Sequence, residues 1–358
     1  MADIDLTNRL QKAVCAAHAS GQPLAITGSG SKHWYGRTSS GKPLDVSGHR
    51  GILNYQPTEL VLTARAGTPL SAIAEALDEH RQRLGFDPPY FGDGATLGGT
   101  IACGLSGPRR PYAGSARDFV LGCRIINGSG EIMRFGGEVM KNVAGFDVAR
   151  LMAGSLGTLG VLLDVSLKVL PHQLAEHTVR LQANYCEAIA IMNRWAGTPL
   201  PITAMAADGQ HTYFRICATP DDAQITADKV GGDFFEEGLS FWKDLREHQL
   251  PFFDDERPLW RLSVPAATPH PLLSGTADAD WFIGWGGAQR WLKSDMPAKT
   301  IFQAMRASVG HATMFRGGDR SGEAFAPLSE PLLALHRRLK QAFDPAGILN
   351  PGRMYESL

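Results

Sequence analysis

The amino-acid sequence predicts an α+β protein built from two domains. Its 358 residues exceed what one hydrophobic core usually fills, since a domain averages about 150 residues. In the first half, short strands alternate with helices and glycine-rich loops. After Pro171 the glycine clusters thin out and the pattern becomes βαββαβ, the order of a ferredoxin-like layer. We therefore expect a first domain at 1–172, a second at 173–325, and a C-terminal helix and tail at 326–358 that returns to the first domain.

The composition is that of a globular protein without a polyanionic partner. Hydrophobic residues make up 44% and charged residues 20% of the chain, which excludes a disordered chain and a coiled coil. The 35 Lys and Arg residues balance 36 Asp and Glu residues, so the basic surface of a nucleic-acid-binding protein is missing. We expect no nucleic acid among its partners.

Targeting signals and metal-binding motifs are also missing from the sequence. No run of about 18 uncharged apolar residues occurs, and residues 1–5 are acidic where a signal peptide is basic, so we expect a cytoplasmic protein without a transmembrane segment. The five cysteines form no CxxC pair, which argues against a disulfide framework, a zinc finger or a bound iron–sulfur cluster. Since no HxH or HExxH occurs among the 11 histidines, we predict no metal site.

The elements of the first domain follow from apolar spacing and turn residues. Thr68 and Pro69 are typical of an N-cap and a first helical residue, and they open an amphipathic helix that includes Leu70 and Leu77. The turn Asn-Gly-Ser-Gly at 127–130 joins two apolar runs and predicts a hairpin. In chain order we expect a helix at 4–19, strands at 24–27 and 60–64, the helix after Pro69, the hairpin strands 119–126 and 132–135, a short helix at 146–153 and a strand at 161–170.

The second domain is predicted in the same way. We expect strands at 178–181, 202–206, 213–217, 259–264 and 281–285, helices at 188–195 and 221–230, and a last helix from Pro331. This region holds six of the seven tryptophans, which indicates a large core or an interface, and burial statistics favour the core.

Three glycine-rich loops carry the chemistry of the first domain. The sequence TGSGSK at 27–32 follows a predicted strand, and its small residues let successive N–H groups face one concavity, as in phosphate sites. It does not match the Walker motif, because no GK[ST] occurs. It does not match the dinucleotide motif GxGxxG either, because His33 stands where the third glycine belongs. Further loops occur at 92–99 (GDGATLGG) and 154–161 (GSLGTLGV). Three such loops suit a large, elongated ligand, and a dinucleotide with a central diphosphate has that shape.

Six short segments follow one another along the chain in a distinctive order. They are Pro23-Leu24 with GSGS at 28–31, ATLGGTIA at 95–102, GSARDFVLG at 114–122, KNVAGFD at 141–147, GSLGTLG at 154–160 and FDPAGILNPG at 343–352. In this order and spacing they resemble the vanillyl-alcohol-oxidase type of FAD-binding proteins. The resemblance covers about the first half of the chain and the tail. It implies an FAD-binding domain of PCMH type followed by a ferredoxin-like cap domain. Within the family, the segment 141–147 and the short length are most similar to the smaller FAD-binding subunits of bacterial glycolate oxidases.

The resemblance also implies which residues bind FAD. The diphosphate is expected at the first two loops, the adenosine half near the third loop, and the flavin beside the segment before residue 116. The expected cofactor-binding residues are Gly28, Ser29, Gly30, Ser31, Lys32, Thr96, Leu97, Gly98, Gly99, Gly107, Tyr112, Gly114, Ser115, Gly157, Gly160 and Val161. In some relatives a histidine of the first loop bonds covalently to the flavin. Here Lys32 takes that place and His33 follows one position later, so we predict noncovalent FAD.

The chain departs from its catalytic relatives at the substrate site. Relatives that oxidise D-2-hydroxy acids resemble one another in a metal-binding HxGDGNxH segment. The nearest stretch here, HATMFRGGD at 311–319, keeps one histidine and loses the second histidine and the GDGN spacing. We interpret His311 as a residue at a strand end and Arg316 as either a carboxylate-binding or an ion-paired arginine. No catalytic residue is assigned.

Two functions from different classes are therefore expected. In the first, the chain is the FAD-binding subunit of a multi-subunit glycolate oxidase that converts glycolate to glyoxylate. Its FAD then relays electrons from a catalytic flavoprotein subunit to an iron–sulfur subunit, and any contact with the inner membrane runs through these partners. In the second, the chain is a stand-alone FAD-dependent 2-hydroxy-acid or alcohol dehydrogenase, in which Arg316, Arg109 or Tyr112 orients the substrate. An enzyme acting on a sugar derivative is a third reading.

Overall fold

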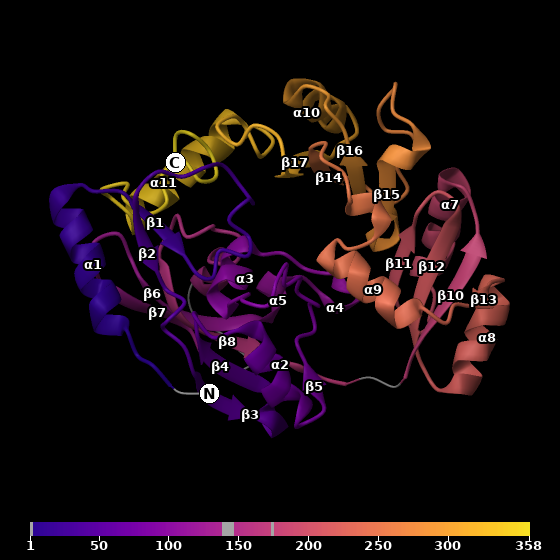
Figure 1. Ribbon diagram of the computed structural model, residues 1–358, viewed down its shortest axis with the longest axis horizontal. Coiled ribbons are helices and arrows are strands. Elements are labelled where there is room, and N and C mark those ends of the chain that lie inside the picture. The colour runs from indigo at the N-terminus through magenta and orange to yellow at the C-terminus, as the bar shows by residue number, and fades with distance from the viewer. Residues whose placement is uncertain (1–2, 138–146, 173–174) are drawn as a thin grey trace. The chain divides into compact units, whose positions relative to one another are not determined.

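The computed structural model describes residues 3–137, 147–172 and 175–358, so most of the predicted motif at 141–147 lies outside the described residues. The chain divides into two compact units (Figure 1). Unit 1 comprises Met1–Ser106, Ser115–His172 and Leu328–Leu358, and unit 2 comprises Gly107–Gly114 and Gln173–Pro327. Residues 107–114, which the sequence analysis assigns to the first domain, are thus grouped with unit 2.

The centre of unit 1 is an antiparallel sheet of five strands in the order β3-β4-β8-β6-β7. Its middle strand, β8, is buried along most of its length because neighbouring strands and helices cover it. The strands are β3 (Ile52–Gln56), β4 (Val61–Arg65), β6 (Val120–Ile126), β7 (Ile132–Gly136) and β8 (Val161–Lys168). Two small pairs complete the unit: β1 (Leu24–Thr27) runs parallel to β2 (Lys42–Asp45), and β5 (Gln82–Arg83) pairs with β9 (Leu170–Pro171).

Helices surround this sheet. They are α1 (Thr7–Ser20), α2 (Leu70–Asp78), α3 (Leu97–Cys103), α5 (Ala116–Phe119), α6 (Val148–Leu151) and α11 (Glu330–Phe343), with a 3₁₀ turn, η1, at Pro57–Glu59. The predicted cap of α2 is wrong. Pro69 is the N-cap residue, and the Thr68 hydroxyl instead accepts from Gly51 N at 3.0 Å and donates to Gly51 O at 3.2 Å. The buried Thr68 side chain therefore joins two loops and is not available to the helix.

Unit 2 begins with the predicted ferredoxin-like order. The elements β10 (Glu176–Gln182), α7 (Tyr185–Ala196), β11 (Ile202–Ala207), β12 (His211–Cys217), α8 (Pro220–Val230) and β13 (Asp233–Phe234) follow one another as βαββαβ. Their strands lie side by side in the order β13-β10-β12-β11 and pair antiparallel. This confirms the fold class predicted for the second domain.

The same sheet continues through four further strands, so that it has eight strands in all. The added elements are β14 (Leu259–Ser263), β15 (Trp281–Gly284), β16 (Gln289–Lys293), α10 (Ala298–Ala307) and β17 (His311–Arg316). Helices α4 (Arg110–Ala113) and α9 (Gly238–Glu247) and the 3₁₀ turns η2 (Pro251–Phe253), η3 (Asp278–Asp280) and η4 (Trp285–Gly287) complete unit 2. The sequence pattern predicts β14, β15 and a strand end at His311, where β17 begins, but it does not predict α4, α9, α10 or β16.

Tryptophans fill the core of unit 2, as expected from the sequence. Trp260 and Trp281 are each 1% exposed. Their indole N–H groups donate to Ser294 O at 3.2 Å and to Thr276 Oγ1 at 2.9 Å, so these large side chains are buried without an unsatisfied donor.

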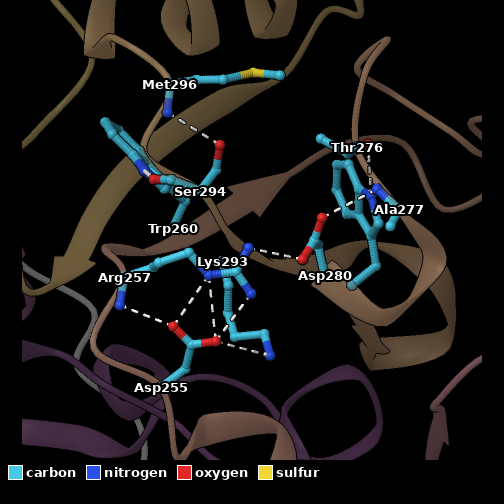
Figure 2. Close-up of polar contacts among 10 residues, drawn as sticks. Asp255, Arg257, Trp260, Thr276, Ala277, Asp280, Lys293, Ser294 and Met296 are labelled. Atoms are coloured by element: carbon cyan, nitrogen blue, oxygen red, sulfur yellow. Dashed lines mark hydrogen bonds and ion pairs between the residues drawn. The ribbon is translucent and has the colours of Figure 1, made fainter.

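A charged network joins the ends of three strands in the same unit (Figure 2). Arg257 lies between two carboxylates, with 2.9 Å from Nη2 to Asp255 Oδ2 and 2.9 Å from Nη1 to Asp280 Oδ1. Lys293 Nζ lies 3.3 Å from the same Asp255 oxygen. Arg257 and Lys293 hold the pKa of the Asp255 carboxyl well below its usual range. The network connects the start of β14, the start of β15 and the end of β16.

Candidate functional site

A cavity of about 350 Å³ opens in unit 1 where the first glycine loop, α3 and the C-terminal tail meet. Its volume is within the range of small-molecule sites. The described residues that line it are Ala25, Ile26, Thr27, Gly28, Ser29, Gly30, Ser31, Lys32, His33, Thr38, Ser39, Thr96, Gly99, Ala102, Cys103, Leu156, Asn350 and Arg353. The whole segment 28–32 that the sequence analysis assigns to the diphosphate is among them.

The first loop follows β1 directly and depends on two glycines. Gly30 has a left-handed φ of +81°, and a Cβ at this position would face open space. Gly28 is restricted by packing, because its Cβ would lie 2.5 Å from Thr96 Oγ1. The first loop is thus held closely against the second by a contact that only glycine allows.

The second loop leads into α3. Thr96 is the N-cap residue of this helix, and its hydroxyl accepts from Gly99 N at 3.3 Å. Gly98 N donates to Ala66 O at 2.7 Å, which anchors the helix start on the loop after β4. Thr96 and Gly99 line the cavity, whereas Leu97 is fully buried in the core and does not.

The third loop lines a smaller adjoining cavity of about 70 Å³ that shares wall residues such as Gly28 and Gly99 with the larger one. Gly157, Gly160 and Gly98 are part of its lining. Val161 is buried in β8 and belongs to neither lining. The structure therefore brings the three predicted loops together around one connected site in unit 1.

The residues expected beside the flavin lie elsewhere in the described structure. Gly107, Tyr112 and Gly114 belong to unit 2, where the Gly107 carbonyl accepts from Trp285 Nε1 at 3.0 Å. Ser115 belongs to unit 1 and begins α5, where its Oγ donates to Asp118 Oδ2 at 2.7 Å. None of the four lines the cavities of unit 1, so their role at the flavin stays a prediction.

The described lining of the larger cavity carries positive charge and no carboxylate. Lys32 is 6% exposed, and its Nζ donates to Tyr90 O at 3.1 Å. The second cation is Arg353, from the tail. Burial raises the pKa of the Cys103 thiol in the same wall, so this group stays uncharged near neutral pH. The donor set thus favours an anionic ligand.

Asn350 and Arg353 are residues that the sequence analysis does not assign to the site. Asn350 is 4% exposed; its Oδ1 accepts from Ile26 N at 2.6 Å and its Nδ2 donates to Leu156 O at 2.7 Å. It therefore bridges the strand before the first loop and the third loop. The motif at 343–352 marks this segment in the sequence, but its position at the cavity follows only from the fold.

These features fit the diphosphate of a dinucleotide. The glycine walls allow close approach of backbone N–H groups, the cavity volume suits part of such a ligand, and two cations lie in a wall without carboxylates. The residues present therefore fit FAD.

The sequence of this chain is similar to known FAD-linked proteins along its whole length. Residues 5–136 match the family model described as FAD binding domain, and residues 319–354 match the FAD linked oxidases, C-terminal domain. The chain is 47% identical over 356 residues to the glycolate oxidase subunit GlcE of Escherichia coli strain K12, which covers 99% of both chains. The chain belongs to the GlcE family of FAD-linked oxidases. Its cofactor is FAD, and it is an FAD-dependent oxidoreductase.

Two further likenesses place the GlcE-like chain among its relatives. It is 30% identical over 168 residues to the glycolate oxidase subunit GlcD of Bacillus subtilis strain 168, which covers 46% of this chain and 35% of that protein. In three dimensions it resembles alkyldihydroxyacetonephosphate synthase with a TM-score of 0.66 at 15% identity, over 96% of this chain and 75% of the other. The structural likeness concerns the fold and agrees with the predicted FAD-binding architecture.

The residues that the sequence analysis considers at a substrate site, Arg109, Arg316 and His311, lie in unit 2. Arg109 is 5% exposed and forms an ion pair with Glu176. Arg316 Nη2 donates to Phe253 O at 3.0 Å. His311 is the first residue of β17, and loss of hydration together with the positive charges of Arg261 and Arg110 lowers its pKa.

Within the residues that the structure describes, no group of three or more His, Cys, Asp or Glu side chains is arranged to hold a metal ion. Likewise, no helix in the described part of the chain has the length and apolar character needed to cross a membrane.

Proposed function

We propose that this chain is the FAD-binding subunit of a glycolate oxidase, in which its FAD relays electrons between two partner subunits. The observation that carries the proposal is the 47% identity to GlcE over 99% of both chains. In the overall reaction glycolate becomes glyoxylate and releases two electrons and two protons. A catalytic flavoprotein subunit performs this oxidation, and an iron–sulfur subunit receives the electrons.

FAD supplies two-electron exchange with organic donors and one-electron exchange with metal centres when it is bound. The task of this chain is to hold the cofactor. The first two glycine loops surround the diphosphate, and Lys32 offers a positive charge to it. The third loop, with Gly157 and Gly160, borders the adenosine half.

The names of the relatives support a multi-subunit complex. GlcE and GlcD are both named as subunits of glycolate oxidase, and the chain is similar to both. A chain similar to GlcE along its full length and to GlcD along part of it fits a complex of two related flavoproteins. We propose that the complex works in the cytoplasm and reaches the inner membrane only through its partners.

Anaerobic reduction of the flavin tests this proposal. The purified, FAD-loaded chain is mixed with glycolate and the flavin absorbance near 450 nm is followed by stopped flow. We expect no bleaching of the isolated chain. After the catalytic flavoprotein subunit is added, we expect bleaching beyond that given by the catalytic subunit with glycolate by itself. Rapid bleaching of the isolated chain would contradict the relay function.

That contradictory outcome would favour the stand-alone dehydrogenase, for which unit 2 offers one specific observation. On β14 and β17, Ser263 pairs with His311 and Arg261 pairs with Thr313, so a guanidinium and an imidazole lie on neighbouring strands. Such a pair can bind a carboxylate and accept a proton. Loss of the bleaching in Arg261→Gln would then locate the substrate there.

The attachment of FAD is tested separately. Lys32 Nζ donates to the Tyr90 carbonyl at 3.1 Å, and His33 Nδ1 lies 2.8 Å from Gly30 O, on the residue's own loop. We therefore propose that no side chain of this loop bonds covalently to the flavin. Acid precipitation should release all yellow colour into the supernatant, and flavin in the washed pellet would show the opposite.

A further inference from the structure

Arg353, near the end of the chain, is an unusual member of the cavity wall. Its Nη1 donates to Arg37 O at 2.6 Å and its Nη2 to His33 O at 2.7 Å. Both partners are neutral carbonyls of the segment that continues the first glycine loop. In the described part of the chain no carboxylate pairs with this guanidinium, and the cavity that it lines contains none.

The Arg353 side chain is half-buried, and its two hydrogen bonds to neutral carbonyls come without an opposite charge. Taking a charge out of water is costly unless an opposite charge or a set of hydrogen bonds replaces the water. Burial lowers the pKa of Arg353, although the group stays protonated at neutral pH. An anion in the cavity would supply the missing counter-charge, and a diphosphate carries two negative charges.

The segment that carries Arg353 is attached to unit 1 by buried polar contacts at its start. Lys340 Nζ donates to Thr158 O at 2.9 Å, to Leu349 O at 2.7 Å and to Asp344 Oδ2 at 2.7 Å. Asp344 in turn accepts from Leu349 N at 2.7 Å. These contacts fasten the start of the tail to the third glycine loop.

Its later part is attached to the first loop. Leu24, in β1, and Leu349 form a parallel bridge, and Asn350 N donates to Leu24 O at 3.0 Å. Arg37 N donates to Arg353 O at 2.9 Å and Arg37 Nε donates to Gly352 O at 3.1 Å. In Figure 1 the yellow C-terminal segment lies beside β1 of the same unit, in agreement with these contacts. The tail therefore spans two of the three loops that form the site.

We propose that residues 344–358 form a C-terminal clasp in which Arg353 is a diphosphate-binding residue, so that FAD binding and docking of the tail stabilise each other. By linkage, whatever favours the docked tail favours FAD, and bound FAD holds the tail in place by the same factor. The inference rests on FAD as the cofactor and not on glycolate as the substrate.

The first test measures binding of FAD and of ADP, which carries the diphosphate without the flavin, to the apoprotein. Flavin fluorescence reports FAD, and displacement of FAD reports ADP. We expect Arg353→Gln to weaken both ligands by about 10-fold or more, because glutamine keeps donors but loses the charge. The matched control is Arg338→Gln, an exposed arginine of α11, which should bind both like the wild type. Wild-type affinity of Arg353→Gln for both ligands would overturn the proposal.

The second test separates a cofactor clasp from a merely structural tail. Carboxypeptidase digests the full chain, and mass spectrometry follows loss of residues from the C-terminus with and without saturating FAD. We expect FAD or ADP to slow removal of the tail about 10-fold in the wild type and much less in Arg353→Gln. Equal rates with and without FAD in the wild type would overturn the coupling. Neither readout uses glycolate, so a failed relay function would leave both results unchanged.

Discussion

Gly99 takes part in both the wall of the site and the start of α3. It lines the two adjoining cavities of unit 1, and its amide N–H donates to Thr96 Oγ1, the cap of α3. A Cβ added here would lie 3.1 Å from Thr96 Oγ1, which is closer than most Cβ contacts, so a side chain at this position is crowded against the helix cap. Gly30 differs, because its restriction is a φ of +81° and the space beside it is open.

We predict that Gly99→Asp abolishes FAD binding while unit 2 stays folded. A carboxylate about 4 Å from a phosphate charge costs about 4 kcal/mol at an effective dielectric constant of about 20, in addition to the steric conflict. FAD titration measures the loss, and near-ultraviolet circular dichroism of the tryptophans reports unit 2. Gly197→Asp, which adds the same charge at an exposed glycine of unit 2, is the control. Unchanged FAD occupancy of Gly99→Asp would remove this residue from the site.

His49 gives a pH-dependent contribution to stability. Its fully buried ring accepts from Leu6 N at 2.9 Å through Nδ1, and burial, together with the nearby Arg65 guanidinium, lowers its pKa. The unfolded chain therefore binds a proton near pH 6.5 that the folded chain does not bind. Asp5, 3.8 Å from Nδ1, opposes this shift only in part. The contribution is fully present above about pH 6.5 and is lost as pH falls below that value.

We predict that His49→Asn is less stable than the wild type at pH 7.5 but loses less stability on acidification. The wild type should lose up to about 1.4 kcal/mol per pH unit below pH 6.5 from this residue alone. Urea unfolding at pH 7.5, 6.5 and 5.5 measures the difference between the two proteins, which cancels the other titrating groups. Parallel pH profiles would show that His49 does not carry the effect.

At the scale of elements, α11 and its tail close unit 1 from the end of the chain. Lys340 and Asp344 are an ion pair four residues apart, 9% and 1% exposed. Burial lowers the pKa of Lys340, and Asp344 opposes that shift. Since Lys340 also donates to two carbonyls, the pair fixes the point at which the chain leaves the helix.

We predict that Lys340→Met destabilises unit 1 by about 3–5 kcal/mol, because it leaves the Asp344 carboxylate buried without its cation. Thermal unfolding of the apoprotein measures the effect. Arg337→Met, on an exposed position of the same helix, should change the stability by less than about 0.5 kcal/mol. Equal melting temperatures of the two variants would contradict the role of the buried pair.

The elements differ in how well the sequence predicts them, and burial explains why. Strand β1, Leu24–Thr27, and the hairpin β6–β7 have apolar runs bounded by turn residues, so their patterns are clear. Strand β16 contains Arg290, which is fully buried because Nε donates to Gly287 O at 2.7 Å and Nη2 to Thr268 O at 2.8 Å. A buried arginine breaks the expected alternation of polar and apolar residues. Helix α9 begins at Gly238 without a side-chain cap, so no start signal marks it.

At the scale of the whole molecule, the three glycine loops and the FAD-linked family are predictable from the sequence, because motif order is a local property of the chain. Asn350 and Arg353 are not, because their role depends on a contact between residues more than 300 positions apart. The cavity of unit 1 is lined by residues from three distant parts of the sequence, namely 25–39, 96–156 and 350–353. Gly107, Tyr112 and Gly114, which are expected at the flavin, belong to unit 2 and do not line this cavity, so their role stays a prediction.

In the proposed function, FAD held in the cavity of unit 1 carries electrons through a glycolate oxidase complex. The most direct measurement compares complexes reconstituted from the catalytic flavoprotein, the iron–sulfur subunit and either Gly30→Asp or Gly231→Asp. Both glycines have a left-handed φ, +81° and +79°, with open space at the Cβ, but only Gly30 lines the cavity. We predict that the Gly30→Asp complex assembles without FAD in this chain, still lets glycolate reduce the flavin of the catalytic subunit, and passes no electrons to an external acceptor. The Gly231→Asp complex should work like the wild type. Wild-type turnover by a Gly30→Asp complex whose unit 1 holds no FAD would contradict the account.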